Sequence, residues 1–439
     1  MIVMKFGGTS VQNASALRQV ASIVADHARQ HDGVVAVLSA TAGTTSQLLD
    51  LARHAAGGCS IDHEFETLEQ RHLEIARELG VSSATIEVFL TECREHLDAA
   101  AILGECTPQT YDAIAGYGEL LSTTLFALYL TSMDVEASWV DARRLVITDD
   151  EFQSASVDIE RTIAAANATI RPLAQHGSVI VTQGFVGATS HGIPTTLGRG
   201  GSDYSAAIIG RCLDATEIQI WTDVSGVYTC DPRIVPTATP LKSISFNDIR
   251  TLALYGAKVL HPETVEPAIA AGIPVRVLNT FEPEAPGTVI QAEEKLDRPI
   301  TALSLIRPCR RIHTDDKGMV ALTSIESINE NIALLVRTLD GYTIVVHEAD
   351  DSIRLAVDVA AVGQAFTQES TACIAVCGVH ITEGAVVARV NASLDAFTSC
   401  TTTSLLHPRC MLVTTPLDQA LDVCASIHAL VASSSSSDS

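Results

Sequence analysis

Two short apolar runs at the start of the chain enclose one helical segment, and this order of strand, helix and strand constrains the fold more than any other feature. Residues 2–6 and 34–38 carry mostly apolar side chains, which is typical of strands buried in a sheet. Between them, residues 14–31 have helical periodicity and follow the turn Gly7-Gly8-Thr9-Ser10. We therefore predict an α/β domain with a mostly parallel central sheet.

Lys5 lies near the carboxyl end of the first predicted strand, beside the glycine turn. Open α/β sheets bind their ligands at that edge, so a phosphate group would meet the ammonium of Lys5 there. The segment is not a Walker A loop, because the lysine precedes Gly7 and Gly8. The alternative is a lysine that faces solvent at the edge of the sheet.

The segment 196–207, with the sequence TLGRGGSDYSAA, is a second candidate site. Three glycines around Arg199 precede a helical pattern, so backbone N–H groups converge at a helix N-terminus, which binds anions. The planar fork of Arg199 suits a carboxylate or a phosphate. Asp203 would repel such a ligand, so we expect it to orient a cation that also contacts the ligand. Alternatively, the segment is a glycine-rich turn followed by an Asp-capped helix.

Three further polar or aromatic positions stand next to predicted elements. The turn SATAGTT at 39–45 follows the second strand, where its hydroxyls either hold polar ligand groups or cap a helix. Glu119 lies in the first turn of a helix predicted over 117–130, where it either complements the helix dipole or holds a substrate ammonium. Phe185 stands between glycines after a strand predicted at 178–183, which is unusual for a core residue.

Residues typical of a nucleotide site follow the strand predicted at 217–221. Thr222 and Asp223 come directly after it, an aromatic residue, Tyr228, follows, and Arg233 and Lys258 come later. This set is suited to binding a purine nucleotide and its phosphates. The chain has only five lysines, and Lys5 and Lys258 both lie in glycine-containing motifs, which indicates a need for a compact ammonium there.

Composition excludes some functions. The net charge of −24 makes nucleic acid an unsuitable partner, so an anionic ligand needs local positive charge. The eleven cysteines show no CxxC pair and no metal-ligand spacing, which favours reduced thiols in a cytoplasmic protein without a metal site. The N-terminus has no signal-peptide pattern, and we expect no apolar run of membrane-spanning length. Four histidines on the charged helices of 46–104 predict a solvated face: His54, His63, His72 and His96.

After Pro299 the pattern changes to short segments. Residues 320–324, 328–339 and 342–347 predict strand, helix and strand. A second α+β unit is predicted from the segments 372–378, 384–394, 400–406, 410–413 and 417–430. The Ser-rich stretch 433–439 is expected to be a disordered tail.

As a set, seven motifs resemble those of the aspartokinases and stand in that family's order. They are KFGGTSV (5–11), VLSATAGTT (37–45), GYGELLS (116–122), QGFVG (183–187), TLGRGGSD (196–203), WTDVSGVYTCDPR (221–233) and GAKVLHP (256–262). The helical insertion between Thr45 and Gly116 is similar to that of the longer, homo-oligomeric members. The resemblance implies an amino-acid-kinase domain over 1–298, a three-layer sandwich, and two α+β ACT-like domains over 299–368 and 369–432.

The activity implied by the resemblance is ATP-dependent phosphorylation of the side-chain carboxylate of L-aspartate to 4-phospho-L-aspartate. This is the first step of the branch that leads to lysine, threonine and methionine. A carboxylate is already ionised, so the reaction needs no general base. The obstacle is repulsion between two anions and the charge on the transferred phosphoryl group, which cations of the enzyme must offset.

The family pattern also implies roles for individual residues. Lys5 would stabilise the phosphoryl group, and Asp203 would organise the lysines around it. Glu119 would hold the substrate ammonium, and Arg199 would bind the α-carboxylate with the help of Ser202. The residues that line the rest of the aspartate site would be Ser39, Thr45 and Phe185. ATP would contact Gly7, Gly8, Thr222, Asp223, Tyr228, Arg233, Lys258 and Val259, with Mg²⁺ held mainly by its phosphates and by water.

Two alternatives stay open from the residues alone. Another amino-acid kinase of the same fold, such as a glutamate kinase, would share Glu119 and Arg199. A catalytically silent amino-acid sensor would use the ACT modules alone, although the retained Lys5, Asp203 and Lys258 argue against it.

The family's first ACT domain usually offers a glycine turn to an effector amino acid, and the stretch we align with it, 324–331, has none. We therefore expect weak or absent feedback inhibition by lysine or threonine, and C-terminal modules that pair subunits into a homodimer or homotetramer.

Overall fold

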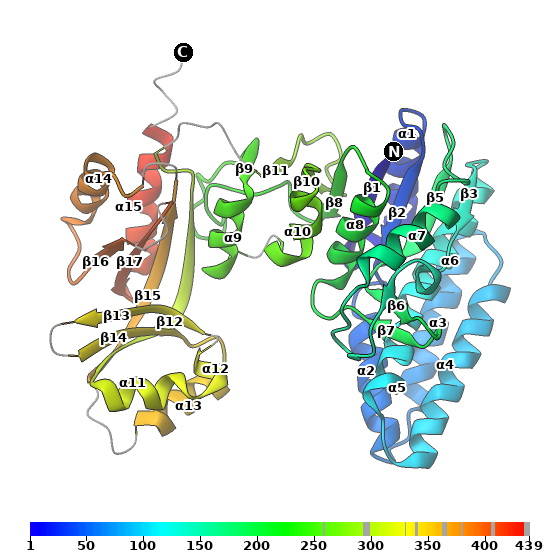
Figure 1. Ribbon diagram of the computed structural model, residues 1–439, viewed down its shortest axis with the longest axis horizontal. Helices are drawn as coiled ribbons and strands as arrows, with labels where there is room; N and C mark the ends of the chain where they lie inside the picture. Colours follow the sequence, from blue (N-terminus) through cyan, green and yellow to red (C-terminus); the bar gives the residue numbers. More distant parts are fainter. Residues whose placement is uncertain are drawn as a thin grey trace. The chain divides into compact units, whose positions relative to one another are not determined.

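The computed structural model describes residues 1–257, 260–292, 299–329, 331–338, 341–361, 367–378, 381–404 and 409–433 (Figure 1). The chain divides into two compact units. The first unit comprises Met1–Val227, Lys242–Phe246 and His261–Ala292. The second comprises Tyr228–Leu241, Asn247–Leu260 and Glu293–Ser439, so two segments of the predicted catalytic domain group with the C-terminal part. The predicted boundary at 298 falls outside the described residues.

An eight-stranded, mostly parallel sheet forms the centre of the first unit, in the order β3-β5-β2-β1-β8-β10-β11-β9. Strand β1 (Ile2–Phe6) pairs in parallel with β2 (Val34–Leu38) and with β8 (Ile218–Thr222), as the buried apolar runs predict. The remaining strands are β3 (Ala137–Trp139), β5 (Val179–Gln183), β9 (Ser243–Ser245), β10 (Val275–Asn279) and β11 (Thr288–Gln291). Only the pairing of β10 with β11 is antiparallel. The predicted α/β class is confirmed.

The register of this sheet brings several chain segments to one edge. Phe6 pairs with Leu38 and with Trp221, and Leu38 pairs with Gln183. The residues that follow these four therefore leave the sheet side by side at its carboxyl edge, where open α/β sheets bind ligands.

Helices cover both faces of the sheet. Ile2, Met4 and Phe6 of β1 belong to one apolar core with helices α1 (Ala14–Ala28) and α6 (Tyr117–Ser132). Helix α8 (Gly201–Cys212) contacts β1, β2 and β8 and packs against α7 (Ile159–Thr169) and α10 (Pro262–Ala270). A small three-stranded sheet of β4 (Ile147–Thr148), β6 (Val186–Thr189) and β7 (Pro194–Thr196) leads into the α8 loop. Short 3-10 turns lie at Gly8–Val11 and Ala142–Arg144.

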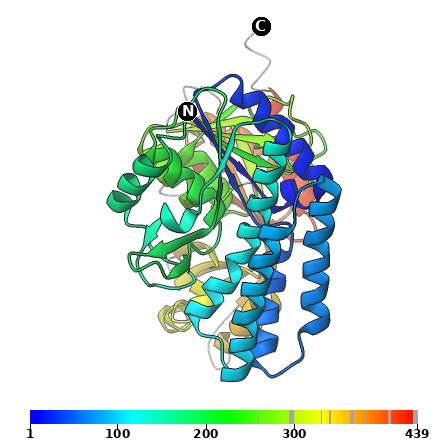
Figure 2. The ribbon, with the colours of Figure 1, turned by 90° about the vertical axis from the view of Figure 1, so that its right-hand side faces the viewer.

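The predicted charged helices form a bundle that extends from the sheet (Figure 2). They are α2 (Thr44–Ala56), α3 (Asp62–Leu79), α4 (Ala84–Leu103) and α5 (Pro108–Ala115). By length and composition, the consecutive helices α5 and α6, Pro108–Ser132, are apolar enough to cross a membrane, which corrects the expectation that no run reaches that length. However, 83% of the apolar window is buried, as in the core helix of a folded domain.

The second unit contains one six-stranded antiparallel sheet, in the order β13-β14-β12-β15-β17-β16. The strands are β12 (Ala302–Thr314), β13 (Ile332–Thr338), β14 (Gly341–His347), β15 (Thr367–Cys377), β16 (Thr401–Ser404) and β17 (Cys410–Pro416). The helices are α9 (Phe246–Leu254, of which Phe246 groups with the first unit), α11 (Asp316–Thr323), α12 (Glu326–Asn329), α13 (Asp351–Ala361), α14 (Gly384–Leu394) and α15 (Ala420–Ser433). This α+β architecture matches the predicted class.

The long strand β12 contributes to two hydrophobic cores. Ile312 packs with α11, α12, β14 and α13, whereas Leu303 packs with β15, α14, β17 and α15. The register shift between Ile306 and Cys309 separates the two halves of β12. The bounds 299–368 and 369–432 remain a prediction, but Ile300 and Leu303 join the core of the later segment because β12 pairs with the end of β15.

The predicted strand–helix–strand order at 320–347 is wrong in its first two elements. Residues 320–323 lie in helix α11, and 332–338 form strand β13. The helix that follows β12 therefore begins at Asp316, and Gly318 lies in its first turn. Consequently, the stretch 324–331 is not the start of the first helix of this module. The predicted tail lies outside the described residues except for Ser433, which ends α15.

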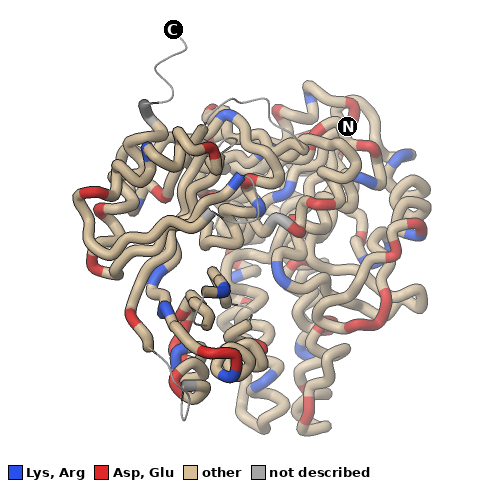
Figure 3. Tube along the Cα trace, turned by 60° about the vertical axis from the view of Figure 1, so that its left-hand side comes forward, with Lys and Arg blue, Asp and Glu red and all other residues tan. Residues whose placement is uncertain are grey.

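Acidic residues outnumber basic ones by 52 to 28. Figure 3 shows the acidic residues scattered over both units rather than gathered in one segment.

Candidate active site

Lys5 and Asp203 form an ion pair at the carboxyl edge of the sheet. Lys5 lies on β1 and Asp203 in the first turn of α8, with 2.7 Å between Nζ and Oδ1. The two side chains are only 11% and 17% exposed, so solvent screens the pair weakly. Asp203 thus holds an ammonium group at the carboxyl edge of the sheet.

Glycines in the loop before α8 let its backbone approach neighbouring residues closely. Gly200 has φ +72°, a left-handed conformation that favours glycine. A Cβ on Gly201 would lie 2.7 Å from ring atom Cδ2 of Phe185, so a side chain there would displace the ring. Ser205 Oγ accepts from the Phe185 N–H and donates to the Gly201 carbonyl, both at 2.9 Å. Phe185 itself has φ +68°, an uncommon conformation for a non-glycine residue, held by these contacts.

A cavity of about 400 Å³ opens beside this ion pair. Eight of the predicted site residues line it: Lys5, Gly8, Ser39, Thr45, Glu119, Phe185, Ser202 and Asp203. They come from the ends of β1, β2 and β5 and the starts of α2, α6 and α8, so distant parts of the sequence meet in one place. The remaining lining residues belong mostly to the 39–46 turn and the glycines before α8.

Glu119 is the buried acid of this cavity. The residue is 3% exposed, and its Oε1 accepts from the Ala40 N–H at 3.1 Å. Its Oε2 has no hydrogen-bond partner among the described residues. Burial raises the pKa of Glu119 to about 8, because the charged form is poorly solvated. A buried carboxylate oxygen without a partner is costly unless a proton or a cation meets it.

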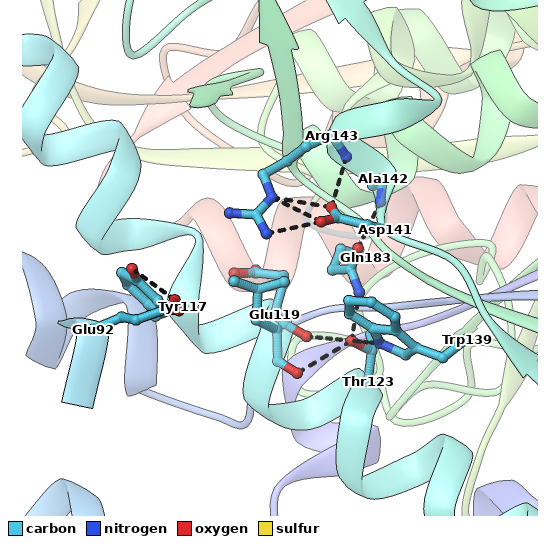
Figure 4. Close-up of polar contacts among 10 residues, drawn as sticks. Glu92, Tyr117, Glu119, Thr123, Trp139, Asp141, Ala142, Arg143 and Gln183 are labelled. Atoms are coloured by element: carbon cyan, nitrogen blue, oxygen red, sulfur yellow. Dashed lines mark hydrogen bonds and ion pairs between the residues drawn. The ribbon is translucent and has the colours of Figure 1, made fainter. Parts of the chain in front are cut away.

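A hydrogen-bond network behind Glu119 fixes the first turns of α6 (Figure 4). Thr123 Oγ1 donates to the Glu119 carbonyl at 2.7 Å and accepts from Gln183 Nε2 and Trp139 Nε1 at 2.7 and 3.0 Å. Gln183 Oε1 in turn accepts from the Ala142 N–H at 2.7 Å. The backbone of Glu119 is thereby linked through Thr123 to strands β5 and β3, which fixes the point from which its side chain extends into the cavity.

Arg199 does not line this cavity. Its residue is exposed and lines a neighbouring cavity of about 590 Å³, together with Tyr204 and Arg211 of α8 and residues of α10. The structure therefore places Arg199 at a different cavity from Glu119 and Lys5.

The predicted nucleotide-binding residues fall into three groups. Gly7, Gly8, Thr222 and Asp223 lie at the carboxyl edge, where the Gly7 N–H donates to the Trp221 carbonyl at 3.2 Å and Thr222 Oγ1 donates to Asp223 at 3.2 Å. Tyr228 and Arg233 belong to the second unit, in which Arg233 pairs with Asp231 at 2.6 Å. Lys258 and Val259 lie outside the described residues.

Our sequence analysis missed residues that hold the loops of the site. Asp112 is buried and accepts at 2.8 Å from both the N–H and the Oγ1 of Thr196, at the start of the α8 loop. His72 is fully buried, so its placement on a solvated face was wrong; the other three histidines are exposed. The signal was its spacing, since His72 falls four residues after Leu68 and four before Ala76 on the buried stripe of α3.

Comparisons with known proteins agree with the motifs. Residues 1–279 match the amino acid kinase family. Lysine-sensitive aspartokinase 3 of Escherichia coli (strain K12) is 38% identical over 313 residues, which cover 70% of this chain and 68% of the relative. The chloroplastic aspartokinase 1 of Arabidopsis thaliana is 35% identical over 369 residues, which cover 81% of this chain and 63% of the relative. The chain thus spans less than two thirds of the plant protein's length.

Solved structures match over the whole chain. A crystal structure of E. coli aspartokinase III in complex with lysine and aspartate has a TM-score of 0.85 at 30% identity, and the match covers 98% of this chain and 99% of that chain. A structure of the same protein with aspartate and ADP has a TM-score of 0.76 with the same identity and coverage. These similarities do not favour a glutamate kinase or a silent sensor. Motifs, fold and site geometry agree with them: the chain belongs to the aspartokinases, within the amino acid kinase family.

Proposed function

We propose that this protein transfers the γ-phosphoryl group of ATP to the side-chain carboxylate of L-aspartate, giving 4-phospho-L-aspartate and ADP. The observation that carries the proposal is Glu119, a buried carboxylate that lines the cavity and leaves Oε2 without a partner among the described residues. The ammonium group of an α-amino acid supplies the missing donor and the missing charge.

Lys5 is the residue that we assign to phosphoryl transfer. Its ammonium group lines the same cavity and is held by Asp203 at 2.7 Å. The reacting carboxylate and the γ-phosphate are both anions, so a fixed cation between them lowers their repulsion and stabilises the charge of the transition state. Asp203 acts on the reaction by orienting Lys5.

Ser39, Thr45, Phe185 and Ser202 complete the aspartate site in this proposal, because they line the cavity around Glu119 and Lys5. The α-carboxylate is assigned to Arg199, which therefore has to turn from the neighbouring cavity towards this one when the substrate binds. Gly198 and Gly200, both with φ +72°, flank Arg199 and allow such a change of its backbone.

ATP is the second substrate, bound next to the aspartate at the carboxyl edge of the sheet. We assign its phosphates to the turn of Gly7 and Gly8 and to Lys258, and the nucleoside to Thr222, Asp223, Tyr228, Arg233 and Val259. The E. coli aspartokinase III structure with aspartate and ADP supports a nucleotide substrate. Asp203 is engaged by Lys5, so we expect Mg²⁺ to be held mainly by the phosphates and water molecules.

The wider setting follows from the same assignment. All eleven cysteines are free thiols, which supports a cytoplasmic enzyme at the first step towards lysine, threonine and methionine. We infer that the second unit pairs subunits into a homodimer or homotetramer. Strand β13 forms one edge of its sheet, and Leu335 on that strand is 46% exposed.

The decisive experiment is ATP-dependent hydroxamate formation, which traps the acyl phosphate with hydroxylamine. Aspartate and glutamate are compared as substrates at equal concentration. We expect turnover with aspartate and little with glutamate. Preferential turnover of glutamate, or none of either with intact folded protein, would contradict the proposal.

A further inference from the structure

Side chains of helix α3 form hydrogen bonds to the turn that carries two of the predicted substrate contacts. This turn, residues 39–45, joins β2 to α2 and supplies Ser39 and Thr45 to the cavity. From α3, Arg71 Nη2 donates to Thr41 Oγ1 at 2.9 Å and to the Ala42 carbonyl at 2.8 Å. His72 Nε2 lies 3.3 Å from the same Thr41 hydroxyl. Thr41 is thus the point at which α3 holds the turn.

The hydrogen bonds around Thr41 have only one consistent direction. His72 Nδ1 lies 2.8 Å from the Leu68 carbonyl, which can only accept, so Nδ1 carries the hydrogen. In the neutral ring Nε2 then accepts, and the single hydrogen of the Thr41 hydroxyl points to it. Thr41 Oγ1 consequently accepts from Arg71 and from Thr44 Oγ1, which is 2.6 Å away. Four residues, Thr41, Thr44, Arg71 and His72, form this Thr41 cluster.

Three members of the cluster are shielded from water, and Arg71 is half-buried. His72 and Thr44 are fully buried, and Thr41 is 1% exposed. Burial lowers the pKa of His72 to about 4, in agreement with the neutral ring that the contacts require. Because the bonds are buried, removing one partner leaves another polar group unsatisfied, which costs more than a bond at the surface.

The turn is held by contacts with neighbouring segments. Its side chains are small, and the ideal Cβ position at Gly43 has no heavy atom within 4 Å. Ordering a backbone needs contacts that offset its conformational entropy. Here they come from three elements. The Ser39 N–H donates to the Phe6 carbonyl of β1 at 3.1 Å. From α6, Ser122 donates to the Ser39 carbonyl at 2.8 Å and Glu119 accepts from the Ala40 N–H at 3.1 Å, while α3 binds Thr41 and Ala42.

We propose that Arg71 and His72 are positioning residues for the aspartate site: by holding Thr41 and Ala42, they set Ser39 and Thr45 against the cavity. This inference rests on the proposed function, because it assigns the cavity to aspartate. Neither residue lines the cavity, so each acts through the turn. The effect should appear in the binding of aspartate rather than in that of ATP.

Three variants test the proposal. Arg71→Gln removes the guanidinium from a half-buried position, and His72→Leu removes both ring nitrogens. Thr41→Val removes the hydroxyl and keeps the shape; since Thr41 itself lines the cavity, its result counts only together with those of the other two variants. Each is expected to raise KM for aspartate about tenfold while KM for ATP stays within about twofold. His72→Gln keeps an acceptor near the position of Nε2, so it should restore most of the aspartate affinity lost in His72→Leu.

Helix α3 also offers matched controls. Arg77 and His63 are exposed on the same helix. Arg77 forms an ion pair with Glu74, three positions before it on α3. Arg77→Gln and His63→Leu should leave both KM values unchanged. Hydrogen exchange of the amides at 40–45 gives a readout without substrate, and it should accelerate in Thr41→Val and Arg71→Gln but not in the controls.

The outcomes separate the two proposals. If the wild type is active with aspartate, but folded Thr41→Val and Arg71→Gln keep its KM for aspartate within about twofold, the positioning role is wrong and the proposed function stands. If KM for ATP rises as much as KM for aspartate, the cluster serves general stability and the positioning role is again wrong. If the wild type does not phosphorylate aspartate, the proposed function fails and the positioning role fails with it.

Discussion

Helices α8 and α11 both present the kind of N-terminus that attracts anions, but they treat it differently. In the described structure, the N-terminus of α8 has Gly200 at its cap position and no side-chain cap, and its acid, Asp203, is engaged by Lys5. At α11 the Asp315 carboxylate accepts from the Gly318 N–H at 2.9 Å, and Asp316 adds a second acid in the first turn. Among the described contacts, the first helix end is not capped by a side chain, whereas the second is capped by its own carboxylate.

This difference shows what makes a helix N-terminus a binding site. Both ends carry the positive end of a helix dipole. At α8 the N–H groups of Gly201 and Asp203 donate to the carbonyls of Gly198 and Gly200, at 3.1 and 3.0 Å, whereas at α11 a carboxylate takes the Gly318 N–H. What distinguishes them is the fate of the neighbouring acid. The Asp203 carboxylate forms an ion pair with Lys5. Among the contacts described for Asp315, its carboxylate accepts from the Gly318 N–H, and no lysine or arginine pairs with it.

The largest expected effect tests the role of Lys5 at the open end. Lys5→Met should lower kcat by roughly 100- to 1,000-fold, because it removes a cation used chiefly in the transition state. KM for ATP should change much less. Lys242→Met is the matched control, since Lys242 is an exposed lysine of the same unit. Near-normal kcat in the Lys5 variant would remove this lysine from the mechanism.

Glu119 provides the next test, on the cationic side of the substrate. Glu119→Gln should raise KM for aspartate about ten- to hundredfold, because a buried charge-assisted contact to the ammonium is lost. ATP binding, measured by equilibrium titration, should stay unchanged. A change in ATP binding alone would instead assign Glu119 to the nucleotide.

The raised pKa of Glu119 also predicts a pH dependence. In the folded protein without substrate, the carboxyl keeps its proton up to about pH 8, whereas the unfolded chain releases it near the ordinary value of 4.5. Folded protein therefore binds more protons in this window, so the stability contributed by Glu119 falls as pH rises through it. A substrate ammonium favours the ionised form and releases the proton.

Aspartate should accordingly bind more tightly as pH increases from 6 to 8, by up to about tenfold per pH unit. The measurement is KM for aspartate across this range in the wild type and in Glu119→Gln. The variant should show a flatter profile, because its amide does not titrate there. An equal slope in both proteins would place the titrating group elsewhere.

The self-capped end of α11 predicts a smaller effect on stability. Asp315→Ala removes the cap and should lower the unfolding free energy of the second unit by about 1 kcal/mol. Asp316→Ala, in the same turn, is the control and should cost less, since Asp316 is not the cap residue. Urea denaturation followed by circular dichroism measures both. Equal losses would mean that the bond to Gly318 contributes nothing beyond charge.

The smallest effect is the one expected for feedback inhibition. The sequence argument used the stretch 324–331, but the structure moves the start of the first helix to Asp315–Gly318, where a glycine is present. There the Gly318 amide is already bonded and two acids oppose an incoming carboxylate. We therefore still expect lysine and threonine to inhibit by less than about twofold at millimolar concentration, because an effector that binds weakly shifts little.

The test is to titrate each amino acid at an aspartate concentration near KM. Strong inhibition at submillimolar concentration would break the comparison between α8 and α11. In that case, Asp315 must move away when the effector binds.

The central strands could be predicted because burial on both faces leaves a recognisable run of apolar residues in the sequence. Residues 2–6 and 34–38 are buried on both faces, so they are almost continuously apolar, and the predicted strands agree with β1 and β2. The residues that follow them were predictable as site candidates for the same reason, since the strands fix where the chain leaves the sheet. Lys5, Ser39 and Phe185 all line the cavity.

Other features depend on contacts between distant segments and leave little local trace. Helix α11 is short, and strand β13 lies at the edge of its sheet, so neither has the long periodic pattern from which an element can be recognised. His72 was misplaced because a charged helix was treated as solvated on all sides. The placement of Arg199 at a different cavity from Glu119 and Lys5 depends on how distant segments pack, which its motif does not determine.

The contribution of β12 to two cores has a consequence for how the C-terminal part can be cut or recombined. The elements α11, β13, β14 and α13 lie in the chain between the paired residues Ile306 and Cys373, so their module is inserted within the other module rather than joined behind it. A truncation after β14 would remove β15, α14, β17 and α15 together, and would leave Ala302–Ile306 of β12 without their pairing partner. Gene rearrangements that preserve folding must therefore exchange both modules together, and limited proteolysis should yield them as a single fragment.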